Sequence, residues 1–166
     1  GHACRMLMQR KSGAWEPSIP GWGLIDDNTG EPIDPISLIS DEKIKMTDWE
    51  LHDFSVQVVR DYIQQELGRK LMSSQGNPKV DPSIWFVGEN GPEWVVVRIV
   101  KYPDKEANQP SNMADIAASC SRMSNIGHFA SVAVANSDDT FEEGAPALPL
   151  WRGNRMVVRF EGLQSS

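Results

Sequence analysis

The chain has 166 residues, 40% of them hydrophobic and 23% charged, which fits a globular fold with room for a core and excludes global disorder. Its 16 Lys and Arg residues oppose 23 Asp and Glu residues, and the resulting net charge of −7 argues against broad, non-specific binding to nucleic-acid phosphates. No apolar run approaches the roughly 20 residues that a membrane-spanning helix needs.

The cysteine content indicates a reducing environment. Cys4 and Cys120 are too few for a disulfide framework, and neither belongs to a CxxC pair. Together with the lack of a signal-peptide pattern, this predicts reduced thiols and a cytoplasmic location. Gly1 and His2 resemble the remnant of a cleaved affinity tag, so no functional role is expected for them.

Residues 1–46 are predicted to form an N-terminal extension, because Gly and Pro interrupt most of this stretch. Residues 5–9 are predicted to be a short strand. Residues 23–26 and 31–33 are predicted to pair as a small hairpin, since Asn28 and Gly30 between them favour the positive φ of a tight turn. The remainder, residues 47–166, is predicted to be a single core domain.

A long helix is predicted over residues 47–67. Thr47 and Glu50 have the spacing of a capping box, and Gly68 is a typical stop. Apolar residues then recur every three or four positions and predict one buried stripe. The members of this stripe are Trp49, Phe54, Val58, Val59, Tyr62, Ile63 and Leu67.

Two strands, residues 83–87 and 94–100, are predicted to form the central hairpin of a sheet. Both are rich in β-branched and aromatic residues, and the segment between them contains turn-forming Gly, Asn and Pro. Residues 94–100 are nearly all apolar, which is typical of a strand buried on both faces. This strand is therefore expected at the centre of the sheet.

A second helix over residues 112–123 is predicted to connect this hairpin to a strand at residues 129–135, and residues 155–160 are predicted to be the last strand. A strand, a crossover helix and another strand indicate a parallel pair. The predicted fold class is therefore α+β or α/β, with a mixed sheet. The six tryptophans are expected mainly in its core.

The order of helix, hairpin, crossover helix and strand, with Asp81 before the hairpin and Arg98 late in it, resembles the core of the PD-(D/E)XK, or restriction-endonuclease-like, superfamily. The resemblance covers roughly residues 47–135. It implies a nuclease-like fold in which an acidic residue opens the hairpin and the next strand carries Glu-x-Lys. Alternate residues of a strand share one face, so that Glu and that Lys both face one metal ion and its water.

This chain departs from the motif at its most important positions. Val96-Val97-Arg98 occupies the positions of Glu-x-Lys. Valine cannot coordinate a cation, and arginine stays protonated, so it cannot act as a base, although it can bind a phosphate or carboxylate. We therefore expect a non-catalytic binding or regulatory domain without a cofactor. The acidic composition favours a protein as its partner.

Two alternatives remain open. The first is a Mg²⁺-dependent DNA nuclease with a relocated carboxylate set, in which Glu50, Asp53, Asp81 and Arg98 would form the site and Glu50 and Asp81 would hold the metal. The second is an unrelated α+β domain that binds a small ligand among its tryptophans. Under the non-catalytic hypothesis, Asp81 starts a turn before Pro82, and Arg98 belongs to an internal ion pair.

The other polar candidates have simpler interpretations. His52 and His128 lack a second metal ligand at a recognisable spacing, so each is expected to be a surface histidine or one with satisfied hydrogen bonds. Cys120 is expected to be a small packing residue. The acidic run Asp138, Asp139, Glu142 and Glu143 lacks the alternation of a calcium loop and is expected to be solvated.

Overall fold

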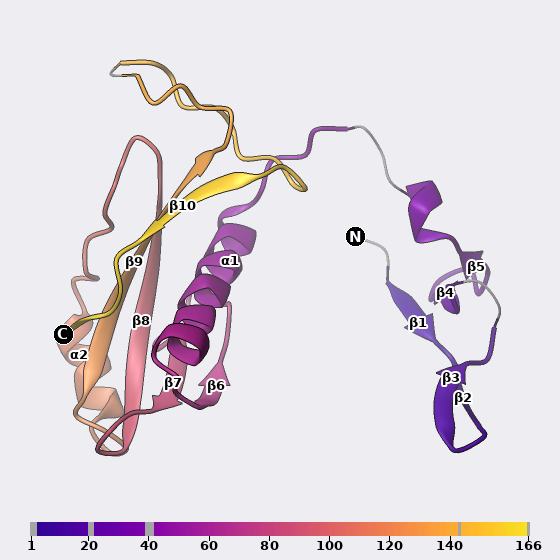
Figure 1. Cartoon of the computed structure of the whole chain (residues 1–166), viewed down its shortest axis with the longest axis horizontal. Helices are drawn as coiled ribbons and strands as arrows, with labels where there is room; N and C mark the ends of the chain where they lie inside the picture. The colour runs from indigo at the N-terminus through magenta and orange to yellow at the C-terminus, as the bar shows by residue number, and fades with distance from the viewer. Residues whose placement is uncertain (1–2, 20–21, 39–41, 143, 166) are drawn as a thin grey trace. The chain divides into compact units, whose positions relative to one another are not determined.

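The computed structural model (Figure 1) describes residues 3–19, 22–38, 42–142 and 144–165. The chain divides into two compact units, Gly1–Glu42 and Lys43–Ser166. In neither does the described part of the chain contain a helix long and apolar enough to cross a membrane.

The N-terminal unit consists of short antiparallel pairs. β4 (Leu24–Asp26) pairs with β5 (Pro32–Ile33), which confirms the predicted hairpin. The single strand predicted over residues 5–9 is wrong, because β1 (Cys4–Met6) pairs with β4 whereas β2 (Met8–Lys11) pairs with β3 (Ala14–Pro17). Because its two halves pair with different strands, the segment forms two short strands instead of one. A 3₁₀ turn, Pro35–Leu38, follows β5.

The second unit contains a mixed six-stranded sheet, which confirms an α+β fold. Five of its strands lie in the order β10 (Met156–Phe160), β9 (Gly127–Asn136), β8 (Pro92–Lys101), β7 (Ile84–Val87) and β6 (Leu71–Ser74). The short β11 (Gln164–Ser165) pairs with β9 beside β10. β8 and β9 are parallel and joined through α2 (Met113–Cys120), and the other pairs are antiparallel, as predicted for the hairpin and the crossover.

The helix α1 (Asp48–Asp61) continues as a π-helical turn, Tyr62–Glu66, and begins with the predicted capping box. Its buried residues include Leu51, Val56 and Val59, whereas Trp49 is 53% exposed. The placement of Trp49 on the buried stripe is therefore wrong. Trp49 lies two residues before Leu51, which is about 200° around the helix and hence on the opposite side.

The two faces of the sheet bury different apolar clusters, with β8 between them. On one face, Val95 and Val97 pack with residues of α1. On the other, Trp94 and Val96 pack against α2. The prediction that β8 is buried on both faces is confirmed.

Most tryptophans, however, are not core residues. Trp94 is the one that is fully buried among those described, whereas Trp15, Trp22 and Trp49 are more than half exposed. The general expectation of tryptophans in the core is therefore wrong. Two of the three exposed rings belong to the N-terminal unit, whose described residues form short strand pairs and one 3₁₀ turn.

Candidate functional site

Asp81 and Arg98 form a bidentate ion pair at the open end of the β7–β8 hairpin, away from its turn. Arg98 Nη2 donates to Asp81 Oδ2 at 2.7 Å, and Nη1 donates to Oδ1 at 3.0 Å. Nη1 also donates to the carbonyl oxygen of Val97 at 2.8 Å. The side chains are 25% and 14% exposed for Arg98 and Asp81. Both carboxylate oxygens of Asp81 therefore already accept a hydrogen bond from the guanidinium.

The hairpin register explains why these two residues meet. Ile84 lies opposite Val95, so continuing the antiparallel register places Asp81 opposite Arg98. Val96 lies two residues before Arg98 on β8 and therefore on the same face of the strand. Val96 is fully buried, in the cluster that also contains Trp94, Phe129 and Ile116. The position that the sequence analysis aligned with the glutamate of Glu-x-Lys is thus part of the apolar core.

The two acidic residues of α1 have other partners. Glu50 Oε2 accepts from the Thr47 amide at 2.8 Å, and Oε1 lies 2.7 Å from Arg152 Nε. These interactions lower the pKa of Glu50 to about 2, with the Thr47 amide contributing most. Asp53 accepts from Gln57 at 2.9 Å. Glu50 therefore acts as a helix cap that also pairs with an arginine.

The described residues contain no group of three or more His, Cys, Asp or Glu side chains that could hold a metal ion. Of the four candidate residues, the structure brings Asp81 and Arg98 together. It gives Glu50 and Asp53 the separate partners named above. A relocated carboxylate set would need these groups to exchange their present partners.

His52 differs from the expectation of a surface or satisfied histidine. It is only 4% exposed, and its Nε2 atom has no hydrogen-bond partner among the described residues. Burial lowers the pKa of His52, and the positive charge of Arg98 lowers it further. His52 is therefore a buried histidine with one ring nitrogen that has no partner among the described residues.

The opposite end of the sheet holds a pair that sequence reasoning missed. His128 Nε2 lies 2.7 Å from Glu93 Oε2, with side chains 18% and 14% exposed. The pair borders a pocket of about 470 Å³ that Arg69 and Tyr62 also line. The parallel register pairs Trp94 with Gly127, so Glu93 and His128 lie at neighbouring strand starts. The predicted crossover was the signal that could have placed them together.

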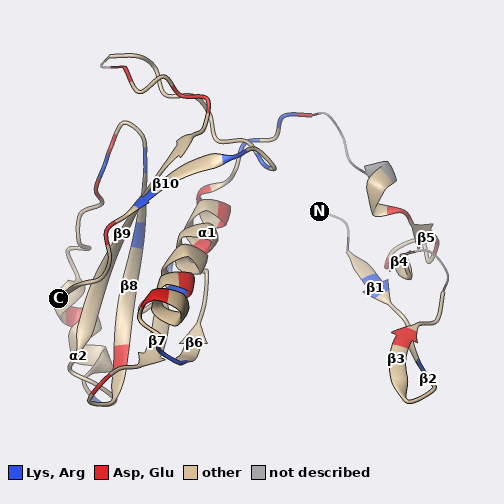
Figure 2. Ribbon diagram, viewed as in Figure 1, with Lys and Arg blue, Asp and Glu red and all other residues tan. Residues whose placement is uncertain are grey.

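The acidic run after β9 is only partly solvated. Asp138 and Glu142 are exposed, whereas Asp139 is 9% exposed and its Oδ1 accepts from the Leu148 amide at 2.8 Å. Its expected solvation is therefore wrong for Asp139, because its carboxylate fixes the returning loop. Glu143 lies outside the described residues. Figure 2 shows Lys and Arg interspersed with Asp and Glu over the second unit, without a continuous basic stripe.

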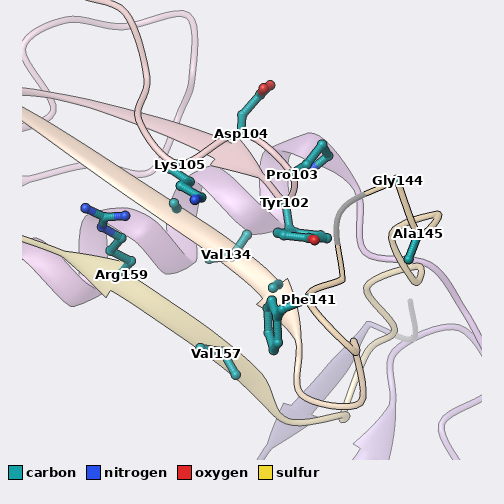
Figure 3. Close-up of a pocket in the computed structure, with 12 residues that line it drawn as sticks. Tyr102, Pro103, Asp104, Lys105, Val134, Phe141, Gly144, Ala145, Val157 and Arg159 are labelled. Carbon is teal, nitrogen blue, oxygen red and sulfur yellow. The ribbon is translucent and has the colours of Figure 1, made fainter.

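A pocket of about 730 Å³ lies on the face of the sheet that carries α2, beyond the end of that helix. Its floor contains Ala133 and Ala135 of β9 and Val157 of β10. Figure 3 shows Lys105 and Arg159 at one end and the rings of Tyr102 and Phe141 at the other. The small residues at alternate positions of β9, Ala133 and Ala135, could have indicated this space in the sequence, whereas the predicted second helix was longer than α2.

A comparison with protein families places most of the chain. A family model described as "Domain of unknown function (DUF8840)" matches residues 49–166, which corresponds to α1 and the whole six-stranded sheet. No curated protein and no solved structure matches the chain. Since the match covers more than half of its length, the chain belongs to the DUF8840 family.

Proposed function

We propose that this member of the DUF8840 family is a non-catalytic binding or regulatory domain on a nuclease-like fold. The observation that carries the proposal is the closed ion pair between Asp81 and Arg98. A metal ion needs free carboxylate oxygens, and both oxygens of Asp81 are engaged by a residue that cannot be deprotonated. Buried Val96 supplies no second ligand.

The order of elements supports the nuclease-like part of the proposal. The chain runs through α1, the meander β6–β7–β8, α2 and then β9, which is parallel to β8. This is the order of helix, hairpin, crossover helix and strand on which the resemblance rests. The resemblance therefore concerns the scaffold, whereas the side chains at its catalytic positions argue against hydrolysis.

A cleavage assay tests the proposal. The full chain is incubated with single-stranded and double-stranded DNA in the presence of Mg²⁺ or Mn²⁺, beside the Asp81→Ala variant and a heat-inactivated sample. We expect no cleavage above that of the heat-inactivated sample. Cleavage that disappears in a folded Asp81→Ala variant would overturn the proposal and establish the nuclease alternative.

We also propose that the partner is a protein and that the domain acts in the cytoplasm. The net charge of −7 and the mixed surface charge disfavour a polyanion. The N-terminal unit exposes large apolar side chains, including those of Trp15, Trp22 and Ile36, and covering such side chains with a protein partner is favourable. The chain has two cysteines and no CxxC pair, a cysteine content that fits a reducing compartment.

Fluorescence anisotropy with labelled duplex DNA and single-stranded RNA tests the class of partner. We expect no saturable binding at about 150 mM salt, where non-specific complexes typically have dissociation constants of 10⁻⁴–10⁻⁶ M. Saturable nucleic-acid binding in the nanomolar range would overturn the assignment of a protein partner. A small-ligand site is favoured by one specific observation, the 730 Å³ pocket, although its described lining contains none of the tryptophans that the sequence suggested for such a site.

A further inference from the structure

The 730 Å³ pocket exists because α2 is too short to cover its face of the sheet. α2 has eight residues, which corresponds to a length of about 12 Å, whereas the ten residues of β9 extend over about 33 Å. The apolar cluster under α2 includes Phe129 at the start of β9 and no residue beyond it on that strand. The second half of β9 therefore has no helix above it on this face.

The floor of the pocket is apolar and has small side chains. Ala133 and Ala135 face the pocket and lie opposite Arg159 and Val157 of β10 in the antiparallel register. Paired residues of neighbouring strands share a face, so these four side chains form one continuous surface. Because these two floor residues are alanines and not larger residues, their side chains do not fill the pocket.

Two aromatic rings form one end of this space. Tyr102 follows β8 directly, and its ring meets that of Phe141 edge to face, with centroids 5.2 Å apart. The Tyr102 hydroxyl donates to the carbonyl oxygen of Glu142 at 3.4 Å, which helps to orient the ring. Pockets of about 300–1,000 Å³ with aromatic walls typically hold small organic molecules.

Two cations form the other end. Lys105 has no ion-pair partner among the described residues, and Arg159 pairs only with Glu161, two residues away. That pair is exposed, with side chains 55% and 72% accessible, so an incoming anion can replace Glu161 at little cost. Among the described residues, Asp104 is the one acidic residue that lines the pocket, and in Figure 3 its carboxylate points away from Val157.

We propose that this pocket is a binding site for a small aromatic carboxylate. The ring of the ligand lies on the alanine floor against Tyr102 and Phe141, and its carboxylate accepts hydrogen bonds from Arg159 and Lys105. An arginine fork matches the geometry of a carboxylate, and charge-assisted hydrogen bonds are the stronger kind. The site contains neither Asp81 nor Arg98, so the proposal stands independently of the absence of catalysis.

Three probes with one ring system and different charges test the proposal. They are 2-naphthoate, 2-naphthylmethanol and 2-naphthylmethylamine, titrated into the full chain by calorimetry at about 50 mM salt. We expect the carboxylate to bind about tenfold more tightly than the alcohol, and the amine to bind most weakly, because charge-assisted hydrogen bonds contribute about this difference. Equal affinities, or no saturable binding of 2-naphthoate at millimolar concentration, would overturn the proposal.

Matched variants locate the site. Arg159→Gln and Lys105→Gln should each reduce the advantage of the carboxylate over the alcohol while leaving the alcohol affinity unchanged. Phe141→Ala should weaken all three probes alike. Arg122→Gln, which removes an exposed arginine that does not line the pocket, should change nothing. The assignment would be refuted if Arg122→Gln lost as much carboxylate affinity as the pocket variants, or if Arg159→Gln and Lys105→Gln both kept the wild-type preference for the carboxylate. Unchanged melting temperatures confirm that the variants are folded.

Discussion

Removal of one partner of the Asp81–Arg98 pair should destabilise the second unit strongly. Arg98→Met keeps the aliphatic stem but leaves the Asp81 carboxylate, 14% exposed, without its two guanidinium hydrogen bonds. Breaking a fully buried ion pair costs about 3–5 kcal/mol, and the partial exposure of this pair reduces the expected loss to about 2–3 kcal/mol. For a chain of this length, the melting temperature should fall by about 5–10 °C.

A double-mutant cycle separates this effect from lost packing. Asp81→Leu should cost a similar amount, because it leaves the guanidinium without its carboxylate, whereas the double variant removes both charges and should be much less unstable than the sum of the single variants. Urea unfolding followed by tryptophan fluorescence, to which buried Trp94 contributes, measures all four proteins. Strict additivity, or an Arg98→Met protein within about 0.5 kcal/mol of wild type, would refute the ion-pair assignment.

Three further predictions concern the helix, the sheet and pH. Leu51→Ala should lower the free energy of unfolding by roughly 2–5 kcal/mol and Trp49→Ala by less than about 0.5 kcal/mol, because Leu51 is 1% and Trp49 53% exposed. A larger loss for Trp49→Ala than for Leu51→Ala would show that Trp49 lies on the buried side of α1 after all. Gly127→Ala should cost about 1–3 kcal/mol, since its Cβ would lie 2.1 Å from the Trp94 ring, and an unchanged melting temperature would contradict this close approach. The pKa of Glu50 is lowered from 4.5 to about 2, so its stabilising effect is present above pH 4.5 and lost as the pH falls towards 2. The difference in unfolding free energy between wild type and Glu50→Gln should therefore shrink over that interval, and a constant difference would contradict a stabilising role for the Glu50 carboxylate.

The sequence predicted the elements that depend on local signals. The Thr47–Glu50 capping box, the β-branched runs of β7 and β8 and the turn around Asn28 each express a short-range preference, and each is present in the structure. Which side of α1 is buried was less predictable. Ser55 and His52 are buried beside Leu51, Val56 and Val59, so the buried face of this helix includes polar residues that hydrophobic periodicity did not include.

The candidate sites depended on information that the linear pattern lacks. Asp81 and Arg98 could be paired from the hairpin register, whereas Glu93 and His128 meet only through the parallel pairing of β8 with β9. The pocket requires the length of α2, which is eight residues rather than the predicted twelve, and the folding back of β10 beside Ala135. Such contacts join residues far apart in the chain, and no local preference encodes them.

The most direct test of the non-catalytic proposal is the melting temperature of the full chain with 10 mM Mg²⁺, compared with NaCl of the same ionic strength. A site with a dissociation constant of about 1 mM would add about 1.4 kcal/mol of stability at this concentration. The closed Asp81–Arg98 pair predicts no difference between the two salts. A rise of several degrees in Mg²⁺ that disappears in Asp81→Ala would show that Asp81 binds the metal and would contradict the account.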